Sequence, residues 1–118
     1  MIEEKQEIHR GDVFWYNATL ATGHLLGGYS RPGIIVQNDV GNKYSPTVVI
    51  VPVSSALHKL HRMPTHAAIG ELYPDKPSMA ESEQIRVINR TDLGAYITHL
   101  SDDVMRRVDE TVRVELGL

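Results

Sequence analysis

Arg31 and Ser54 are the residues of this chain whose types and spacing best suit chemistry on a phosphate. Arg31 opens a short apolar run, Gly33–Val36, and Ser54 closes a second one, Thr47–Val53. Both runs are rich in Val and Ile and bounded by turn formers, which predicts buried β-strands. In an antiparallel pair, the start of one strand lies beside the end of the other, so Arg31 and Ser54 would meet at one rim of the sheet. A guanidinium beside a hydroxyl there suits an oxyanion or a phosphate.

The alternative for these two residues is structural, and spacing alone favours it: Arg31 forms a surface ion pair and Ser54 simply ends a strand. The charge distribution is compatible with an anionic ligand. The chain has a net charge of −3, yet the stretch from Arg31 to His66 holds four basic residues and a single acid, Asp39. A local basic face on an acidic body can bind an anion without broad attraction to phosphate.

The rest of the chain predicts short strands followed by one helix, which is typical of a small, strongly bent antiparallel barrel. Further strands are expected at Val13–Tyr16, Thr65–Ile69, Met79–Ile88 and Tyr96–Leu100, with a long surface loop over Asn38–Pro46. Ser101 is expected to cap the terminal helix and Gly117 to end it. An apolar stripe on that helix should pack on the barrel; it comprises Val104, Met105, Val108, Val112 and Leu116.

Length and composition limit the number of domains, the cellular compartment and the catalytic chemistry that we expect. At 118 residues the chain is expected to be one domain, 1–118, with residues 1–9 as a mobile or loosely docked extension. It has no Cys, which excludes disulfides and thiol catalysis and fits a reducing cytoplasm. No apolar run approaches membrane-spanning length, so we expect a cytoplasmic protein without an anchor. The spacing of His58, His61 and His66 could suggest a metal site, but no Cys or acid completes it, and we expect no metal or other cofactor.

Several longer blocks together resemble one family. They are GDVFW, GGYSRPGIIVQNDVGNKYSPTVVIVPVS, MPTHAAI, ESEQIRVI and THLSDDVMRRVDETVRVELGL. In order and with few gaps, they look like the MazF/PemK toxins, the ribonuclease halves of type II toxin–antitoxin pairs. The resemblance runs from about Arg10 to Leu118. It implies an SH3-like barrel with a C-terminal helix, which forms a homodimer and binds RNA across the dimer face.

The resemblance also implies an activity, the metal-independent and sequence-specific cleavage of single-stranded RNA. Arg31 matches the family's catalytic Arg, and Ser54 stands where close relatives carry Thr. The 2′-hydroxyl of the RNA would be the nucleophile, giving 2′,3′-cyclic phosphate and 5′-hydroxyl ends. His61 or His66 could serve as general base, although neither can be placed beside Arg31 from sequence. The expected RNA-binding residues are Gly28, Tyr29, Asn38, His61, Glu83 and Gln84.

The implied partners are mRNA and a cognate antitoxin with a disordered acidic segment, which would fold onto the basic face and compete with RNA. The family usually carries a carboxylate in the loop before Arg31, and this chain has none between Asn17 and Ser30. Two other functions stay open at this point. One is a CcdB-type toxin, of similar fold, which binds DNA gyrase and cleaves nothing. The other is an inactive barrel that only binds RNA or an antitoxin.

Overall fold

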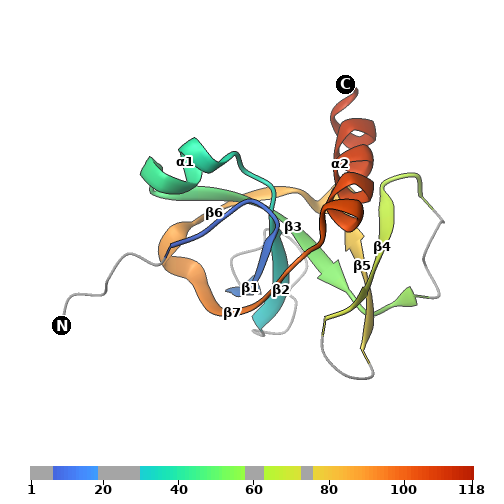
Figure 1. Ribbon diagram of the computed structural model, residues 1–118, viewed down its shortest axis with the longest axis horizontal. Coiled ribbons are helices and arrows are strands. Elements are labelled where there is room, and N and C mark those ends of the chain that lie inside the picture. Colours follow the sequence, from blue (N-terminus) through green and yellow to red (C-terminus); the bar gives the residue numbers. More distant parts are fainter. Residues whose placement is uncertain (1–6, 19–29, 58–62, 73–75) are drawn as a thin grey trace.

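The computed structural model describes residues 7–18, 30–57, 63–72 and 76–118, whose strands form one curled antiparallel sheet (Figure 1). The strands are β1 (Asp12–Asn17), β2 (Ser30–Ile35), β3 (Thr47–Ser54), β4 (His66–Glu71), β5 (Pro77–Glu81), β6 (Arg86–Asn89) and β7 (Leu93–His99). The helices are α1 (Asp39–Tyr44), α2 (Asp102–Leu116) and the 3-10 turns η3 (Ser82–Gln84) and η4 (Arg90–Asp92). Strand order is β4-β5-β3-β2-β1-β7, and β6 pairs with β3. This half-barrel with a C-terminal helix confirms the predicted fold class.

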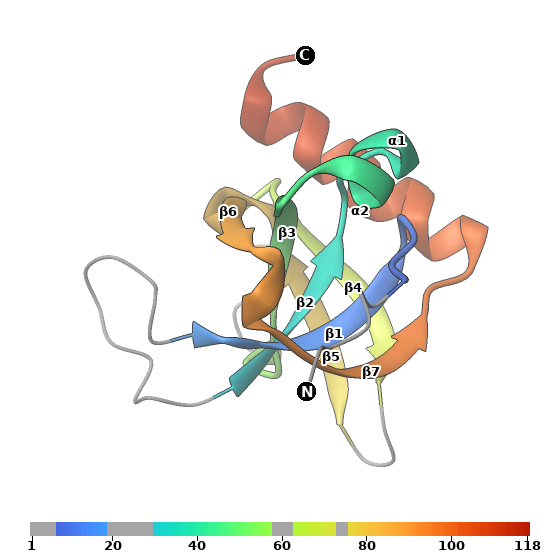
Figure 2. The same ribbon diagram turned by 90° about the vertical axis from the view of Figure 1, so that its left-hand side faces the viewer.

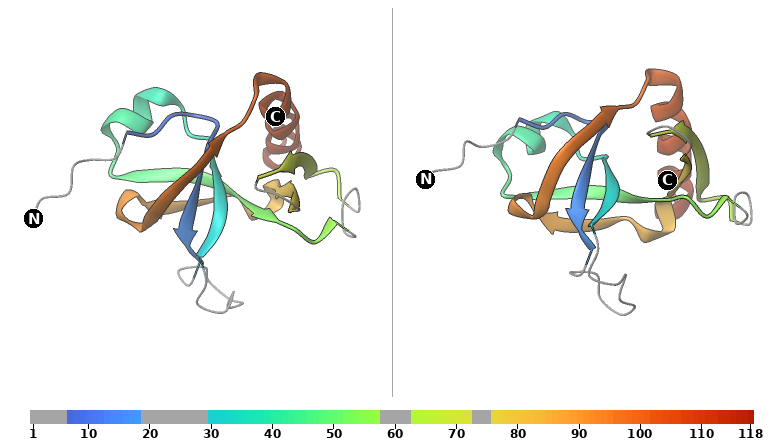
Figure 3. Two further views of the ribbon diagram at one scale, coloured as in Figure 1. Left: turned by 60° about the horizontal axis from the view of Figure 1, so that its bottom comes forward. Right: turned by 90° about the horizontal axis from the view of Figure 1, so that it is seen from below.

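The sheet has two apolar faces, because side chains alternate along each strand. On one face, Ile34 and Val51 pack in a cluster with Val108 of α2. On the other face, Ile35 and Ile50 belong to a second cluster that contains no residue of α2. We call this second face, which carries Ile35 and Ile50, the distal face. The views in Figures 2 and 3 show the curl of the sheet and α2 lying to one side of it.

Helix α2 begins and ends where the sequence predicts. The Ser101 hydroxyl accepts a hydrogen bond from the N–H of Val104 (3.3 Å), and Gly117 ends the helix in the left-handed region at φ 73°. Val108 is fully buried, as expected from its place in the apolar stripe. Leu116, in contrast, is 53% exposed, so the packed part of the stripe ends one turn earlier than predicted. No helix in the described part of the chain is long and apolar enough to cross a membrane.

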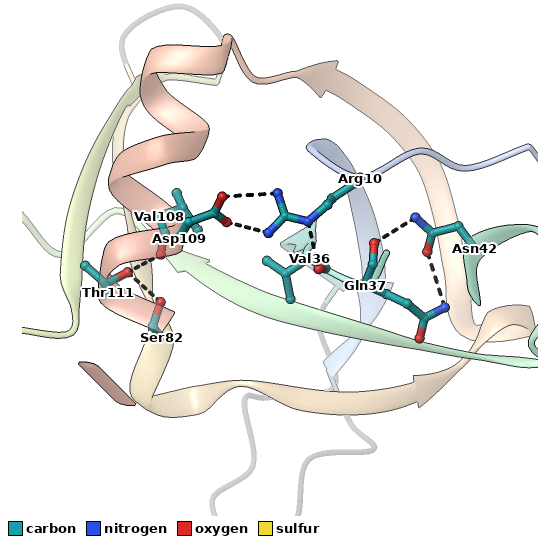
Figure 4. Close-up of polar contacts among 8 residues, drawn as sticks. All are labelled: Arg10, Val36, Gln37, Asn42, Ser82, Val108, Asp109 and Thr111. Atoms are coloured by element: carbon teal, nitrogen blue, oxygen red, sulfur yellow. Dashed lines mark hydrogen bonds and ion pairs between the residues drawn. The ribbon is translucent and has the colours of Figure 1, made fainter. Parts of the chain in front are cut away.

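Polar contacts fasten α2 to the sheet, as Figure 4 shows. The Arg10 guanidinium forms a two-pronged ion pair with Asp109, with N–O distances of 3.2 Å and 2.5 Å, and also donates to the carbonyl of Val36. The buried hydroxyls of Ser82 and Thr111 lie 2.7 Å apart. Because Ser82 begins η3, this second contact ties the turn between β5 and β6 to the helix.

The surface loop predicted over Asn38–Pro46 was wrong, because this segment contains the helix α1. Asn38 caps it, with its side-chain oxygen accepting from the N–H of Gly41 (2.8 Å). The side chain of Asn42 is buried and donates to the carbonyl of Gln37 (3.0 Å). A buried, hydrogen-bonded amide therefore holds this short helix against the end of β2 (Figure 4).

The single strand predicted over Met79–Ile88 was also wrong. The structure divides it into β5, the turn η3 and β6, which pair with different parts of β3. Ser82 lies fully buried at this break, bonded to α2. As a result, Glu83 and Gln84 project from a tight turn instead of from the middle of a strand.

Candidate active site

The alignment of β2 and β3 relates Arg31 to Ser54. The observed antiparallel pairing of the two strands ends at Gly33 and Pro52. Continued by two residues, the same alignment would set Arg31 opposite Ser54, at the point where β3 pairs with β5 through Ser54 and Met79. Residues separated by two or four positions on a strand share a face of the sheet. Gly33 and Arg31 are two and four residues from Ile35, so both lie on the distal face. Ser54 is four residues from Ile50 and therefore lies on the same face. Both residues are half-buried. The alignment agrees with the predicted meeting of guanidinium and hydroxyl at one rim, which stays a prediction because the observed pairing ends two residues before it.

Each of these two side chains keeps the hydrogens that an anion would need. The Ser54 oxygen accepts a hydrogen bond from the N–H of Ala56 (3.0 Å), which orients it and leaves its hydroxyl hydrogen available for donation. The Arg31 side chain forms no ion pair or hydrogen bond with the described residues. A surface ion pair, the structural alternative for Arg31, is therefore not formed with those residues.

A pocket of about 440 Å³ is lined by residues of β1, η3 and β6. Neither Arg31 nor Ser54 lines it, and its link to the pair is Tyr16, the cross-strand neighbour of Arg31. Its walls include Tyr16 and Asn17 from β1, Gln84 from η3 and Arg86 from β6. Gln84 is exposed, and its side-chain oxygen accepts from the Arg86 guanidinium (3.2 Å), which also bonds the Gln84 carbonyl (3.1 Å). Amide and guanidinium groups on the wall of an open pocket can read the edges of an unpaired base.

Two residues of this face, Tyr16 and Arg86, were missed by reasoning from the sequence. Tyr16 pairs directly with Arg31, and Arg86 pairs with Ile50 on the other edge of β3. Both therefore lie on the distal face with Arg31. Burial raises the pKa of the Tyr16 hydroxyl, while the positive charges of Arg86 and Arg31 act in the opposite direction. No local sequence signal reveals such neighbours, since they depend on the pairing of several strands.

Glu83 does not face this pocket freely. Its carboxylate accepts a hydrogen bond from the hydroxyl of Thr65 (2.7 Å) and lies 3.0 Å from Nε2 of His66. Burial acts to raise the pKa of Glu83, but these hydrogen bonds outweigh it and the pKa lies below its ordinary value. Glu83 thus joins η3 to the start of β4, and Gln84 is the member of the pair whose side chain is exposed.

The other predicted site residues are not gathered at this rim. Asn38 follows the opposite end of β2 from Arg31, and its side-chain oxygen is used to cap α1. The separation of these ends is visible in Figure 2. Gly28, Tyr29 and His61 lie outside the described residues, as does most of the loop between Asn17 and Ser30.

One group of described side chains has metal-ligand character. His66, Glu81 and Glu83 each offer a donor atom, and these atoms lie within 4.8 Å of one another. Two of these three side chains are already hydrogen-bonded to each other, because Nε2 of His66 bonds the carboxylate of Glu83. This His66–Glu83 contact fastens η3 to the start of β4.

Comparison with known proteins identifies the family. A family model described as "PemK-like, MazF-like toxin of type II toxin-antitoxin system" matches residues 9–116. The chain belongs to this family of toxins. A relative, Endoribonuclease EndoA of Bacillus subtilis (strain 168), is 36% identical over 113 residues, which cover 94% of this chain and 96% of the relative. The resemblance found in the sequence is thus confirmed, and the CcdB-type alternative is not favoured.

Solved structures support the assignment at the level of the fold. MazF of Deinococcus radiodurans matches with a TM-score of 0.78 at 18% identity, over 96% of this MazF/PemK chain and 99% of the other. A mycobacterial structure described as an endoribonuclease in complex with its cognate antitoxin matches with a TM-score of 0.77 at 22% identity, over 94% and 96% of the two chains.

Proposed function

We propose that this MazF/PemK-family toxin is an endoribonuclease that cleaves single-stranded mRNA at Arg31 and Ser54 without a metal ion. The observation that supports the proposal is the pairing of β2 with β3 up to Gly33 and Pro52, which, continued by two residues, would set Arg31 opposite Ser54 on the distal face. A phosphodiester seated there would meet a fork of guanidinium donors on one side and a hydroxyl donor on the other. Arg86 adds a second positive charge on the same face, across β3.

The chemistry needs no cofactor, because RNA carries its own nucleophile. The 2′-oxygen forms a bond to phosphorus as the bond from phosphorus to the 5′-oxygen breaks. The proton lost by the 2′-hydroxyl is balanced by the one gained by the 5′-oxygen, leaving 2′,3′-cyclic phosphate and 5′-hydroxyl ends. Negative charge on the phosphorane oxygens grows during this step. Arg31 neutralises that charge, and Ser54 donates a hydrogen bond to it.

Base recognition falls to the pocket that Tyr16, the cross-strand neighbour of Arg31, shares with Gln84 and Arg86. Gln84 offers both an amide donor and an acceptor at its mouth, and Arg86 orients the Gln84 side chain. Glu83 contributes by holding the turn in place through Thr65 and His66. RNA is read in this way only when its bases are unstacked, which fits a single-stranded substrate.

The proposed partners follow from the same face. An acidic antitoxin segment that folds over Arg31 would neutralise it and exclude RNA. We also propose that the toxin acts as a homodimer and in the cytoplasm, where mRNA is found.

The test is incubation of the protein with a single-stranded transcript of known sequence in buffer containing EDTA, followed by mapping of both new ends. We expect a few discrete fragments that carry 2′,3′-cyclic phosphate and 5′-hydroxyl groups. Intact RNA, or cleavage that appears only when Mg²⁺ or Zn²⁺ replaces the chelator, would overturn the proposal.

A further inference from the structure

The hydroxyl of Tyr16 is a buried donor without a partner. Tyr16 is 1% exposed, and its hydroxyl oxygen forms no hydrogen bond with the described residues. Buried polar atoms of folded proteins nearly always have a hydrogen-bond partner, because leaving one unsatisfied costs free energy. A phenylalanine would fill the same space without that cost. Packing therefore does not explain the presence of the hydroxyl, which indicates a functional role.

The fold places this hydroxyl within the candidate active site. Tyr16 is the direct cross-strand neighbour of Arg31, and its ring lies over Gly33, two residues further along β2. A Cβ atom added to Gly33 would lie only 3.0 Å from the ring. Glycine thus makes room for an aromatic ring at this position. The same tyrosine forms part of the wall of the pocket that contains Gln84 and Arg86.

Two positively charged side chains act on the hydroxyl. Arg86 and Arg31 both act on it electrostatically, with Arg86 exerting the larger effect, and Glu81 is the acid that opposes them. The guanidinium of Arg86 is bonded to the carbonyl and side-chain oxygens of Gln84, an exposed residue. Such contacts at a surface contribute little and can be exchanged for contacts with a bound anion. Two guanidinium groups and a neutral donor are complementary to a phosphate.

We propose that the Tyr16 hydroxyl donates a hydrogen bond to a phosphate oxygen of the RNA held between Arg31 and Arg86. This assignment rests on the proposed ribonuclease function and adds a third protein donor to it. Because burial raises the pKa of Tyr16, the hydroxyl stays protonated near neutral pH and acts as a donor, not as a base. Its hydrogen bond strengthens as charge builds on the phosphate oxygens, so its main effect is on the rate of cleavage. Arg86 orients Gln84 in the protein without RNA. When RNA binds, Arg86 exchanges this contact for the phosphate, which opens the way to the Tyr16 hydroxyl and frees the Gln84 side chain to contact a base.

The test compares Tyr16→Phe with Tyr44→Phe, which removes a hydroxyl from a residue that is 70% exposed on α1. The substrate is a short single-stranded RNA containing the cleavage site mapped for the wild-type protein. Binding is measured with the same RNA carrying a 2′-deoxy nucleotide before the cut, which cannot react. We expect Tyr16→Phe to lower kcat by about a hundredfold, to weaken binding by no more than about tenfold and to leave the unfolding temperature unchanged or raised. Tyr44→Phe should match the wild type in all three.

The outcomes separate this inference from the function on which it rests. If the wild type cleaves, Arg31→Ala is inactive and Tyr16→Phe keeps a wild-type kcat, the role given to Tyr16 is wrong and the ribonuclease function stands. The role given to Tyr16 is also wrong if Tyr16→Phe unfolds at a lower temperature and its loss of activity matches the fraction of unfolded protein. The hydroxyl would then be structural. If the wild type cleaves no RNA under any condition, the proposed function fails, and the role of Tyr16 with it.

Discussion

Removing the carboxylate of Glu83 should destabilise the protein far more than removing the neighbouring amide of Gln84. In Glu83→Ala the Thr65 hydroxyl and Nε2 of His66 lose their acceptor, and both residues are buried. Each stranded group costs about 1–3 kcal/mol, so we expect a loss of about 3 kcal/mol in the free energy of unfolding. For a chain of 118 residues, this corresponds to a fall of roughly 10–15 °C in Tm.

The assay is urea or thermal unfolding followed by circular dichroism, with Gln84→Ala as the matched control. The Gln84 side chain is exposed and bonds only the Arg86 guanidinium among the contacts observed, so its loss should cost less than about 0.5 kcal/mol. Equal stability of Glu83→Ala and Gln84→Ala would refute the reasoning, because the network around Glu83 would then contribute nothing beyond a surface contact.

The same carboxylate gives the protein a pH dependence of known sign. The pKa of Glu83 in the folded state lies below its ordinary value of 4.5. Its ionised form therefore stabilises the fold above that value, and the contribution disappears as the pH falls through the lower folded pKa. We expect Glu83→Gln to be less stable than the wild type near neutral pH and the difference to narrow as the pH falls below the ordinary value. A difference that is constant with pH would contradict the ionic contribution.

Two further substitutions test the packing beside the site and the helix boundary. Gly33→Ala places a Cβ 2.9 Å from Ile50 and 3.0 Å from the Tyr16 ring. We expect it to lower the free energy of unfolding in urea by about 1–3 kcal/mol and to reduce RNA cleavage as Tyr16 moves. Unchanged values in both assays would show that the ring does not lie over Gly33. Ser101→Ala removes the N-cap of α2. We expect it to lower the free energy of unfolding by about 1 kcal/mol without altering cleavage per folded molecule. A decrease of less than about 0.2 kcal/mol would show that the cap does not stabilise the protein.

Much of the fold could be predicted from the sequence because its signals are local. The Val- and Ile-rich runs specify β2 and β3, and Ser101 and Gly117 mark the ends of α2. Local signals failed where distant contacts decide the structure. The segment after Asn38 looks like a loop because it contains Gly41 and other turn formers, yet the buried Asn42 holds it as a helix.

The site was predictable to the same degree. The antiparallel pairing of β2 with β3, on which the expected meeting of Arg31 and Ser54 rests, could be predicted because the two strands are consecutive and their ends are marked. The neighbours from other strands could not. Tyr16 stands in a run of aromatic and apolar residues with no alternation, so nothing in the sequence tells which face it occupies. Glu83 was expected to bind RNA because its structural contacts could not be seen in the sequence. Its partners Thr65 and His66 are 18 and 17 residues away along the chain.

The measurement that tests the central claim most directly is single-turnover cleavage of a mapped RNA, in EDTA, by Ser54→Ala, Ser54→Thr, Ser55→Ala and Arg31→Ala, with folding of each verified. Ser55 is the exposed neighbour of Ser54 and serves as the control. We predict that the variants lacking the Ser54 hydroxyl or the Arg31 guanidinium lose at least about a hundredfold in rate. Ser54→Thr, which keeps the hydroxyl, and Ser55→Ala should stay close to the wild type. Cleavage by folded Ser54→Ala and Arg31→Ala at the wild-type rate would show that the phosphate is not activated at this pair of strands.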